Sequence, residues 1–262
     1  MRKAFSLVEL SIVLVILGLL TGGILAGQSL IRAAELRAVT TEYQRYYTAT
    51  QAFRDKYFAL PGDWNNAQAV WGVQGTNCSG TVTTLTTTGT CNGDNSNTID
   101  FSATNGGTAE AWQYWRQLAL AGLIEGSYTG ISGTNWYDYT AGTNVPKSKM
   151  NGAAWAAANA SNYAGDTTTY KFDYGNMLKF IYLSSAASTP VLKPEEAWNI
   201  DTKMDDGLPG AGKIIAWNPN GWYNASTNPT TCTLSTANTG TPGTYNLSVT
   251  SAQCSLYFPK SI

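Results

Sequence analysis

The chain has 262 residues, a formal net charge of −1 and no histidine. A nearly neutral balance excludes the strong field that draws proteins to nucleic acid or acidic membranes, and the lack of histidine excludes the commonest general base and metal ligand. Charged residues make up only 13% of the chain, against about 25% in an ordinary soluble domain, which favours a secreted domain with β-structure and long loops.

The first predicted element is a membrane-spanning helix. Residues 5–31 form an apolar run in which Glu9 is the one charge. At about 1.5 Å per residue the run makes about 40 Å of helix, more than a hydrocarbon layer of about 30 Å. A secretory signal peptide would have an apolar stretch of only about 7–15 residues. Because Arg2 and Lys3 precede the run, the positive-inside rule places the rest of the chain outside. An uncleaved membrane anchor is the simpler alternative.

Glu9 is the unusual residue of this helix. A carboxylate near the bilayer centre costs about 2.5–3.5 kcal/mol and usually has a function. Glu9 lies in the string Lys3-Ala4-Phe5-Ser6-Leu7-Val8-Glu9-Leu10, which resembles the class III signal of type IV prepilins and type II secretion pseudopilins. The resemblance implies that prepilin peptidase cuts between Ala4 and Phe5, and that the Phe5 amine is methylated. It also implies that Glu9 is kept for assembly, where it would meet the Phe5 amine of a neighbouring subunit. The family usually has Gly where this chain has Ala4.

An amphipathic continuation of the helix is predicted for residues 32–60. Apolar or semi-apolar residues recur there in alternating steps of three and four, which predicts a helix that packs on the chain's own head. They are Leu36, Val39, Tyr43, Tyr46, Thr50, Phe53 and Tyr57. The charged residues lie largely off this stripe: Arg32, Glu35, Arg37, Glu42, Arg45 and Arg54.

The rest of the chain predicts an α+β head. The turn Leu60-Pro61-Gly62-Asp63 ends the helix, residues 64–108 read as an irregular loop, and residues 109–123 have the spacing of a short helix. Five strands are predicted from Tyr, Phe, Ile and Val-rich runs: 170–174, 179–183, 213–217, 245–250 and 255–258. We therefore expect a pilin-like fold, with the long helix covering an antiparallel sheet that carries long loops.

Four cysteines suggest two disulfide bonds, because an even count in an exported chain is typical of a disulfide framework. Local pairing, Cys78 with Cys91 and Cys232 with Cys254, closes one short loop in each case. Crossed connectivities and free buried thiols are the alternatives.

Three further patterns are weaker. Asp201, Asp205 and Asp206 could hold calcium with oxygen ligands, as loops of some secretion pseudopilins do; the alternative is a capped turn. The segment 207–213 matches GxxxxGK, but Ile214 follows where a phosphate-binding loop has Ser or Thr, so we expect a turn before a strand. Exposed tryptophans could form an adhesive platform or fill small irregular cores: Trp64, Trp71, Trp136, Trp155 and Trp222.

The predicted organisation is a leader at residues 1–4, a membrane and polymerisation half at 5–31, an amphipathic half at 32–60 and a head at 61–262. The resemblance implies a non-enzymatic structural subunit of a pilus or secretion pseudopilus. It would lie in the inner membrane with its head outside and then in an extracellular or periplasmic filament. Its expected partners are other pilins, prepilin peptidase, the assembly platform and membrane lipid. The alternative is a minor subunit whose large head caps the filament and binds a surface, DNA or a secreted substrate.

Overall fold

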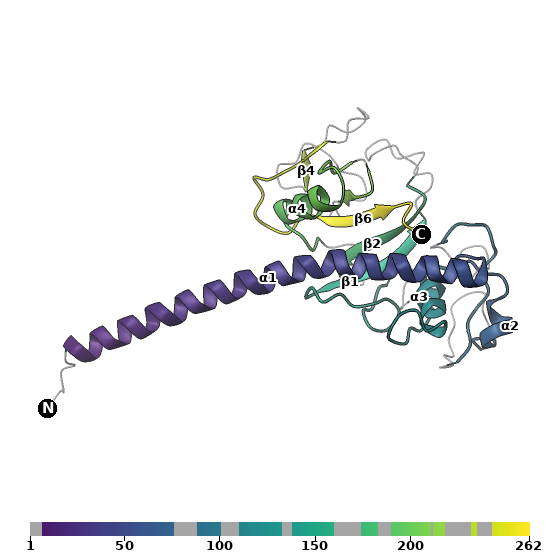
Figure 1. Cartoon of the computed structure of the whole chain (residues 1–262), viewed down its shortest axis with the longest axis horizontal. Coiled ribbons are helices and arrows are strands. Elements are labelled where there is room, and N and C mark those ends of the chain that lie inside the picture. The colour runs from purple at the N-terminus through teal and green to yellow at the C-terminus, as the bar shows by residue number, and fades with distance from the viewer. Residues whose placement is uncertain are drawn as a thin grey trace.

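A long helix with a head on its C-terminal half makes up the molecule (Figure 1). The computed structural model describes residues 7–75, 88–100, 110–132, 138–159, 174–182, 190–210, 212–217, 232–234 and 243–262. The helix, α1 (Leu7–Tyr57), runs without interruption from the apolar segment into the head. Its first half projects away from the other elements, while its second half lies across the sheet.

The end of α1 is set by local backbone chemistry. Phe58 takes a left-handed conformation with φ 53°, and its N–H donates to the Arg54 carbonyl at 2.8 Å. Gly62 also has positive φ, and a side chain there would collide with the Glu110 carbonyl. The Gly62 N–H donates to Gln117 at 2.6 Å. The predicted helix end is confirmed, and only glycine fits where the turn meets the helix that begins at Glu110.

The head is built on an antiparallel sheet with spatial order β1-β2-β6-β3. The strands are β1 (Ala153–Asn159), β2 (Asn176–Tyr182), β6 (Ser255–Pro259) and β3 (Ile215–Trp217). Each neighbouring pair is antiparallel. A separate two-stranded ribbon pairs β4 (Thr233–Leu234) with β5 (Thr244–Tyr245). The predicted α+β class with an antiparallel sheet is therefore confirmed.

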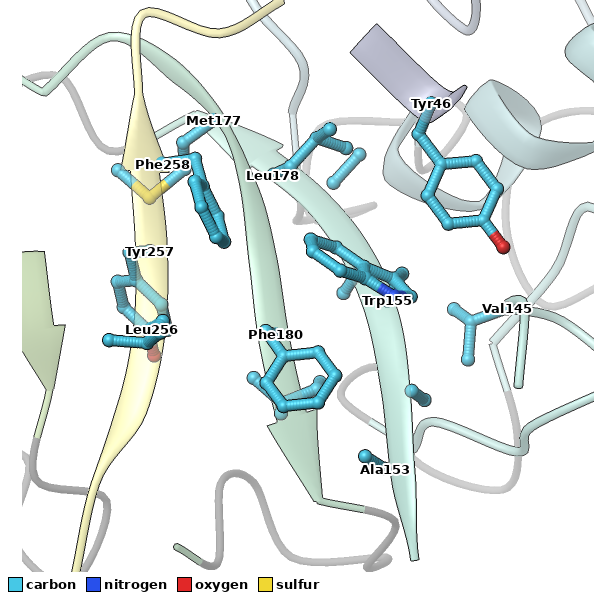
Figure 2. Close-up of a cluster of buried hydrophobic side chains, with 14 of the residues drawn as sticks. Tyr46, Val145, Ala153, Trp155, Met177, Leu178, Phe180, Leu256, Tyr257 and Phe258 are labelled. Carbon is cyan, nitrogen blue, oxygen red and sulfur yellow. The ribbon is translucent and has the colours of Figure 1, made fainter. Parts of the chain in front are cut away.

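Aromatic side chains fill the space between α1 and the sheet. The ring of Tyr46 lies 5.7 Å from Trp155 of β1, centroid to centroid, and Tyr43 stacks on Phe258 of β6 at 4.3 Å. Figure 2 shows side chains of three neighbouring strands gathered here, where the Trp155 ring lies 5.1 Å from Phe180 and 5.5 Å from Phe258, centroid to centroid. Burying one such side chain contributes about 1.5–3 kcal/mol. The predicted stripe is confirmed, because its members are buried or half-buried against the head.

Three shorter helices complete the described head: α2 (Ala67–Trp71), α3 (Glu110–Leu120) and α4 (Pro194–Met204). The predicted helix at 109–123 is confirmed as α3, which is buried along its length through Leu118. The Cys232–Cys254 disulfide has a Cα–Cα distance of 5.0 Å and ties the β4–β5 ribbon to the start of β6.

The strand predictions are correct for three segments, which became β2, β3 and β6 with ends that differ from the prediction by at most three residues. The strand predicted at 245–250 is wrong, because pairing stops at Tyr245. The Leu247 N–H donates back to the Tyr245 carbonyl at 3.1 Å and Val249 to Asn246 at 3.1 Å, so the chain turns. Of the strand predicted at 170–174, residues 170–173 lie outside the described part.

Four of the described elements were not predicted: the short elements α2, which lies in the segment expected to be an irregular loop, and β4, and the longer elements β1 and α4. The strand β1 has the sequence AAWAAAN, and alanine is a better helix former than strand former. The helix α4 has Pro194 in its first turn with Glu195 and Glu196 beside it, which are ordinary signals of a helix start. The omission of β1 is explained by its pairing with β2, which overrides the helix preference of alanine. The helix α4 could have been predicted from its start signals.

Candidate functional site

The first half of α1 is an apolar surface that the head leaves uncovered. Every Leu, Val and Ile side chain from Leu7 to Ile31 is at least 50% exposed. This helix is long and apolar enough to cross a membrane, with a mean hydropathy of 2.4 in its most apolar window. So large an apolar surface is not stable in water and needs lipid or other protein around it. Glu9 lies on this surface in the first turn of α1. Ala4 and Phe5, the predicted processing residues, lie outside the described part.

A charged junction follows the apolar half directly. Two nitrogens of Arg32 donate to the Glu196 carboxylate of α4, each at 2.6 Å, and a third donates to Glu35 at 3.0 Å. The fork geometry of a guanidinium suits such a two-point pair. Arg32 therefore ties the head to α1 at the residue where the apolar run ends.

A buried carboxylate holds the middle of α1 to the sheet. Glu42 accepts hydrogen bonds from the Ser148 hydroxyl at 2.7 Å, from the Trp155 indole N–H at 2.8 Å and from the Lys149 backbone N–H at 2.8 Å. The sequence pattern placed Glu42 off the packing stripe, and that expectation is wrong because these three donors converge on it. The Glu35 carboxylate also faces the head, where it accepts from the Asn151 N–H at 3.4 Å.

The three aspartates predicted for calcium do come together. Oxygens of Asp201, Asp205 and Asp206 lie within 4.8 Å of one another. Asp201 is buried near the end of α4, and burial raises its pKa to about 7. It accepts from the Tyr245 hydroxyl at 2.7 Å and the Gly207 N–H at 3.2 Å.

The carboxylates of Asp205 and Asp206 accept hydrogen bonds from backbone N–H groups of the turn between α4 and β3. Asp205 accepts from the N–H groups of Lys213 and Ile214, and Asp206 accepts from the Leu208 N–H at 2.8 Å. The capped turn is thus observed. Calcium binding stays a prediction.

A second acidic cluster was not predicted. Oxygens of Asp63, Asp94 and Glu110 lie within 4.8 Å of one another, and both Asp63 and Glu110 are only 3% exposed. Burial raises the pKa of Glu110 to about 8 and that of Asp63 to about 6. Four backbone N–H groups of the 94–100 segment donate to these two carboxylates at 2.8–3.0 Å. The cluster fastens that loop to the end of α1 and to α3.

The remaining candidate patterns have structural roles in the described residues. The described residues of the GxxxxGK segment, 207–210, 212 and 213, lie in the turn before β3, and the Asp205 carboxylate accepts from the N–H groups of Lys213 and Ile214 at its end. Trp155 is fully buried under α1, so it is not part of an exposed platform. Trp64 and Trp71 are half-buried and pack edge to face at 5.6 Å. Trp136 and Trp222 lie outside the described residues.

Of the predicted disulfides, Cys232–Cys254 is confirmed. Cys91 is disulfide-bonded and buried, while Cys78 lies outside the described residues, so their pairing stays a prediction. A comparison of the chain with protein-family models, curated proteins and solved structures finds no match.

Proposed function

We propose that this chain is a structural subunit of a type IV pilus-like or type II secretion pseudopilus filament. The observation that carries the proposal is the form of α1, which is one helix with two different environments. Its first half exposes only apolar surface apart from Glu9 and a few small polar residues. Its second half is the central support of the head.

Such a helix has two ways to cover its apolar half. Before assembly, lipid can cover it, since the run is long enough to span the hydrocarbon layer. In a filament, the same surface of other subunits can cover it, and each subunit then projects its head outward. Removal of the short basic leader by prepilin peptidase belongs to this proposal, as does the pairing of Glu9 with the Phe5 amine of a neighbour.

A minor subunit at the filament tip is the second candidate. A head of about 200 residues is large for a bulk subunit, which favours it. Abundance separates the two, because a bulk subunit dominates sheared filaments whereas a tip subunit is scarce in them.

Glu9→Ala tests the proposal. Loss of the carboxylate makes insertion of the helix into the membrane more favourable. It also removes the partner of the Phe5 amine of a neighbouring subunit, and that pair would stabilise the correct axial alignment of the two subunits. We expect normal amounts of the variant in the membrane fraction and at least a tenfold loss of chain in sheared filaments.

Ser11→Ala is the matched control, because in the described part of the chain the Ser11 hydroxyl donates to its own helix, to the Val8 carbonyl at 2.9 Å. It should assemble like the wild type. Equal filament yields for Glu9→Ala and the wild type would remove Glu9 from assembly.

A further inference from the structure

A groove on the head brings together residues of α1, of the turn before β3 and of the chain after β6. It is lined by Tyr43 and Tyr47 on α1, by Lys203 and Lys213 around the turn, and by Lys260 beyond β6. Its volume is about 940 Å³, within the range of about 300–1,000 Å³ that is usual for sites of small ligands. We call it the lysine groove.

The lysine groove gathers positive charge. Lys203, Lys213 and Lys260 are exposed, and in the described part of the chain none of their ammonium groups forms an ion pair with a carboxylate. No Asp or Glu of the described residues lines the groove. An ammonium group offers three N–H donors and no acceptor, so the groove is suited to a ligand that carries anionic groups.

The carboxylates closest in sequence are those of the turn. The Asp205 carboxylate lies behind the groove wall and accepts from the backbone N–H groups of Lys213 and Ile214. Asp206 is exposed but does not line the groove, and Asp201 is buried. The chain as a whole carries −1. The positive charge is therefore local, which favours a ligand with a few anionic groups over a long polyanion.

A stack of aromatic rings leads into the lysine groove. Phe258 of β6 stacks on Tyr43 at 4.3 Å, and Tyr43 stacks on Tyr47 at 6.1 Å, centroid to centroid. Phe258 is buried and Tyr43 is half-buried, whereas Tyr47 is 38% exposed. The stack thus ends in one ring that is open to the groove, and a flat ring of a ligand can continue it.

One open ring and a few positive charges favour an acidic sugar over a nucleic acid. Single-stranded nucleic acid stacks successive bases on several aromatic side chains and gains affinity from many phosphate contacts. A sugar acid needs less, because the C–H face of one ring packs on one aromatic ring while its carboxylates bind lysines. Its hydroxyls suit the neutral polar groups of the lining, which include the Gln44 amide and the hydroxyls of Tyr43 and Tyr47.

We propose that the lysine groove binds an acidic saccharide, with one sugar ring on Tyr47 and its carboxylates on Lys203, Lys213 and Lys260. The site goes beyond the proposed filament function and does not depend on it, because the groove lies on the head and not on the apolar half of α1.

Titration of the full chain with trigalacturonate tests the site. A polyoxyethylene detergent keeps the chain in solution without a sugar head group that would compete. Galactotriose, the neutral sugar of the same length, should bind about tenfold more weakly or worse. Lys203→Gln combined with Lys213→Gln should weaken trigalacturonate binding by about tenfold or more, since a hydrogen bond to a charged group contributes roughly that factor. The Lys213 backbone N–H that Asp205 accepts stays in place.

Lys147→Gln combined with Lys149→Gln is the matched control. It makes the same change of charge at two exposed lysines that do not line the groove, so it should bind trigalacturonate like the wild type. Both double variants should melt at the wild-type temperature. Tyr47→Ala should weaken binding by roughly three- to tenfold through loss of the ring contact. Equal losses in the two double variants, or no binding at millimolar trigalacturonate, would overturn the site.

A short thymidine oligonucleotide separates the acidic sugar from nucleic acid. At the same salt concentration it should bind more weakly than trigalacturonate. Tighter binding of the oligonucleotide, lost in the Lys203→Gln and Lys213→Gln double variant, would overturn the acidic saccharide as the ligand of the groove.

Discussion

At the scale of single residues, three carboxylates decide how the head is held together. Glu42, Glu110 and Asp201 are each less than a tenth exposed, and each accepts hydrogen bonds from groups far away in the sequence. The sequence shows that these residues are carboxylates, but it does not show that they are buried. Their hydrogen-bond donors lie in other parts of the chain, which only the folded structure brings to them. Glu42 illustrates this: it falls between stripe positions, and only the packing of β1 under α1 brings Trp155 to it.

Glu42→Ala should lower the free energy of unfolding by about 3 kcal/mol or more. The change leaves the buried Ser148 hydroxyl and the buried Trp155 indole N–H without their acceptor, and each unsatisfied buried group costs about 1–3 kcal/mol. The part-buried Lys149 N–H also loses its acceptor. Chemical denaturation of the full chain in detergent measures the loss. The exposed Arg37→Ala, on the same helix, should change stability by less than about 0.5 kcal/mol. Similar values for the two variants would contradict the role of Glu42.

The Glu110 cluster should make the head less stable as pH rises. The ordinary pKa of the group is 4.5 and burial raises it to about 8, so the folded chain keeps a proton that the unfolded chain has lost. This contribution is complete below about pH 4.5 and is lost as pH rises to about 8. Asp63, whose pKa is raised to about 6, acts in the same direction.

Glu110→Gln keeps a neutral group of the same shape at this position. The fall in melting temperature between pH 5 and pH 8 should therefore be smaller in the variant than in the wild type. An equal fall in melting temperature for the variant and the wild type between pH 5 and pH 8 would show that Glu110 does not retain its proton in the folded head.

Calcium binding at Asp201, Asp205 and Asp206 remains a prediction from the sequence. A bound ion would stabilise the folded head by linkage. Millimolar calcium should then raise the melting temperature of the full chain relative to chelator, and Asp206→Asn should remove the difference. An unchanged melting temperature in the wild type would leave the three residues as caps of the turn before β3.

At the scale of elements, the sequence predicts α1 best because its signals are long and periodic. Its two halves and its stripe follow from hydrophobic spacing, and its end at Tyr57, shortly before the turn at Leu60-Pro61, follows from turn chemistry. Short strands are harder to predict from the sequence. The strand β1 is mostly alanine, and it is a strand because it pairs with β2 over seven residue pairs. The acidic cluster at Asp63 could not be predicted, since its members are brought together only by the packing of α3 against the end of α1.

At the scale of the whole molecule, the head and the apolar half of α1 are different kinds of surface. In its described part, the head buries most of its aromatic residues together with several hydrogen-bonded carboxylates, and a disulfide links Cys232 to Cys254. The apolar half has no such cover and depends on what surrounds it. The proposed filament of many copies would suit both parts of the molecule. It would cover the apolar halves of α1 in its centre and leave the heads in contact with water.

The mass of the intact chain from sheared filaments tests this account most directly. We predict a chain that begins at Phe5 with a methylated amine. Loss of Arg2 and Lys3 reduces the basic residues from 16 to 14 against 17 acidic ones, which changes the side-chain charge from −1 to −3. A chain that still begins at Met1, in cells with active prepilin peptidase, would contradict the account.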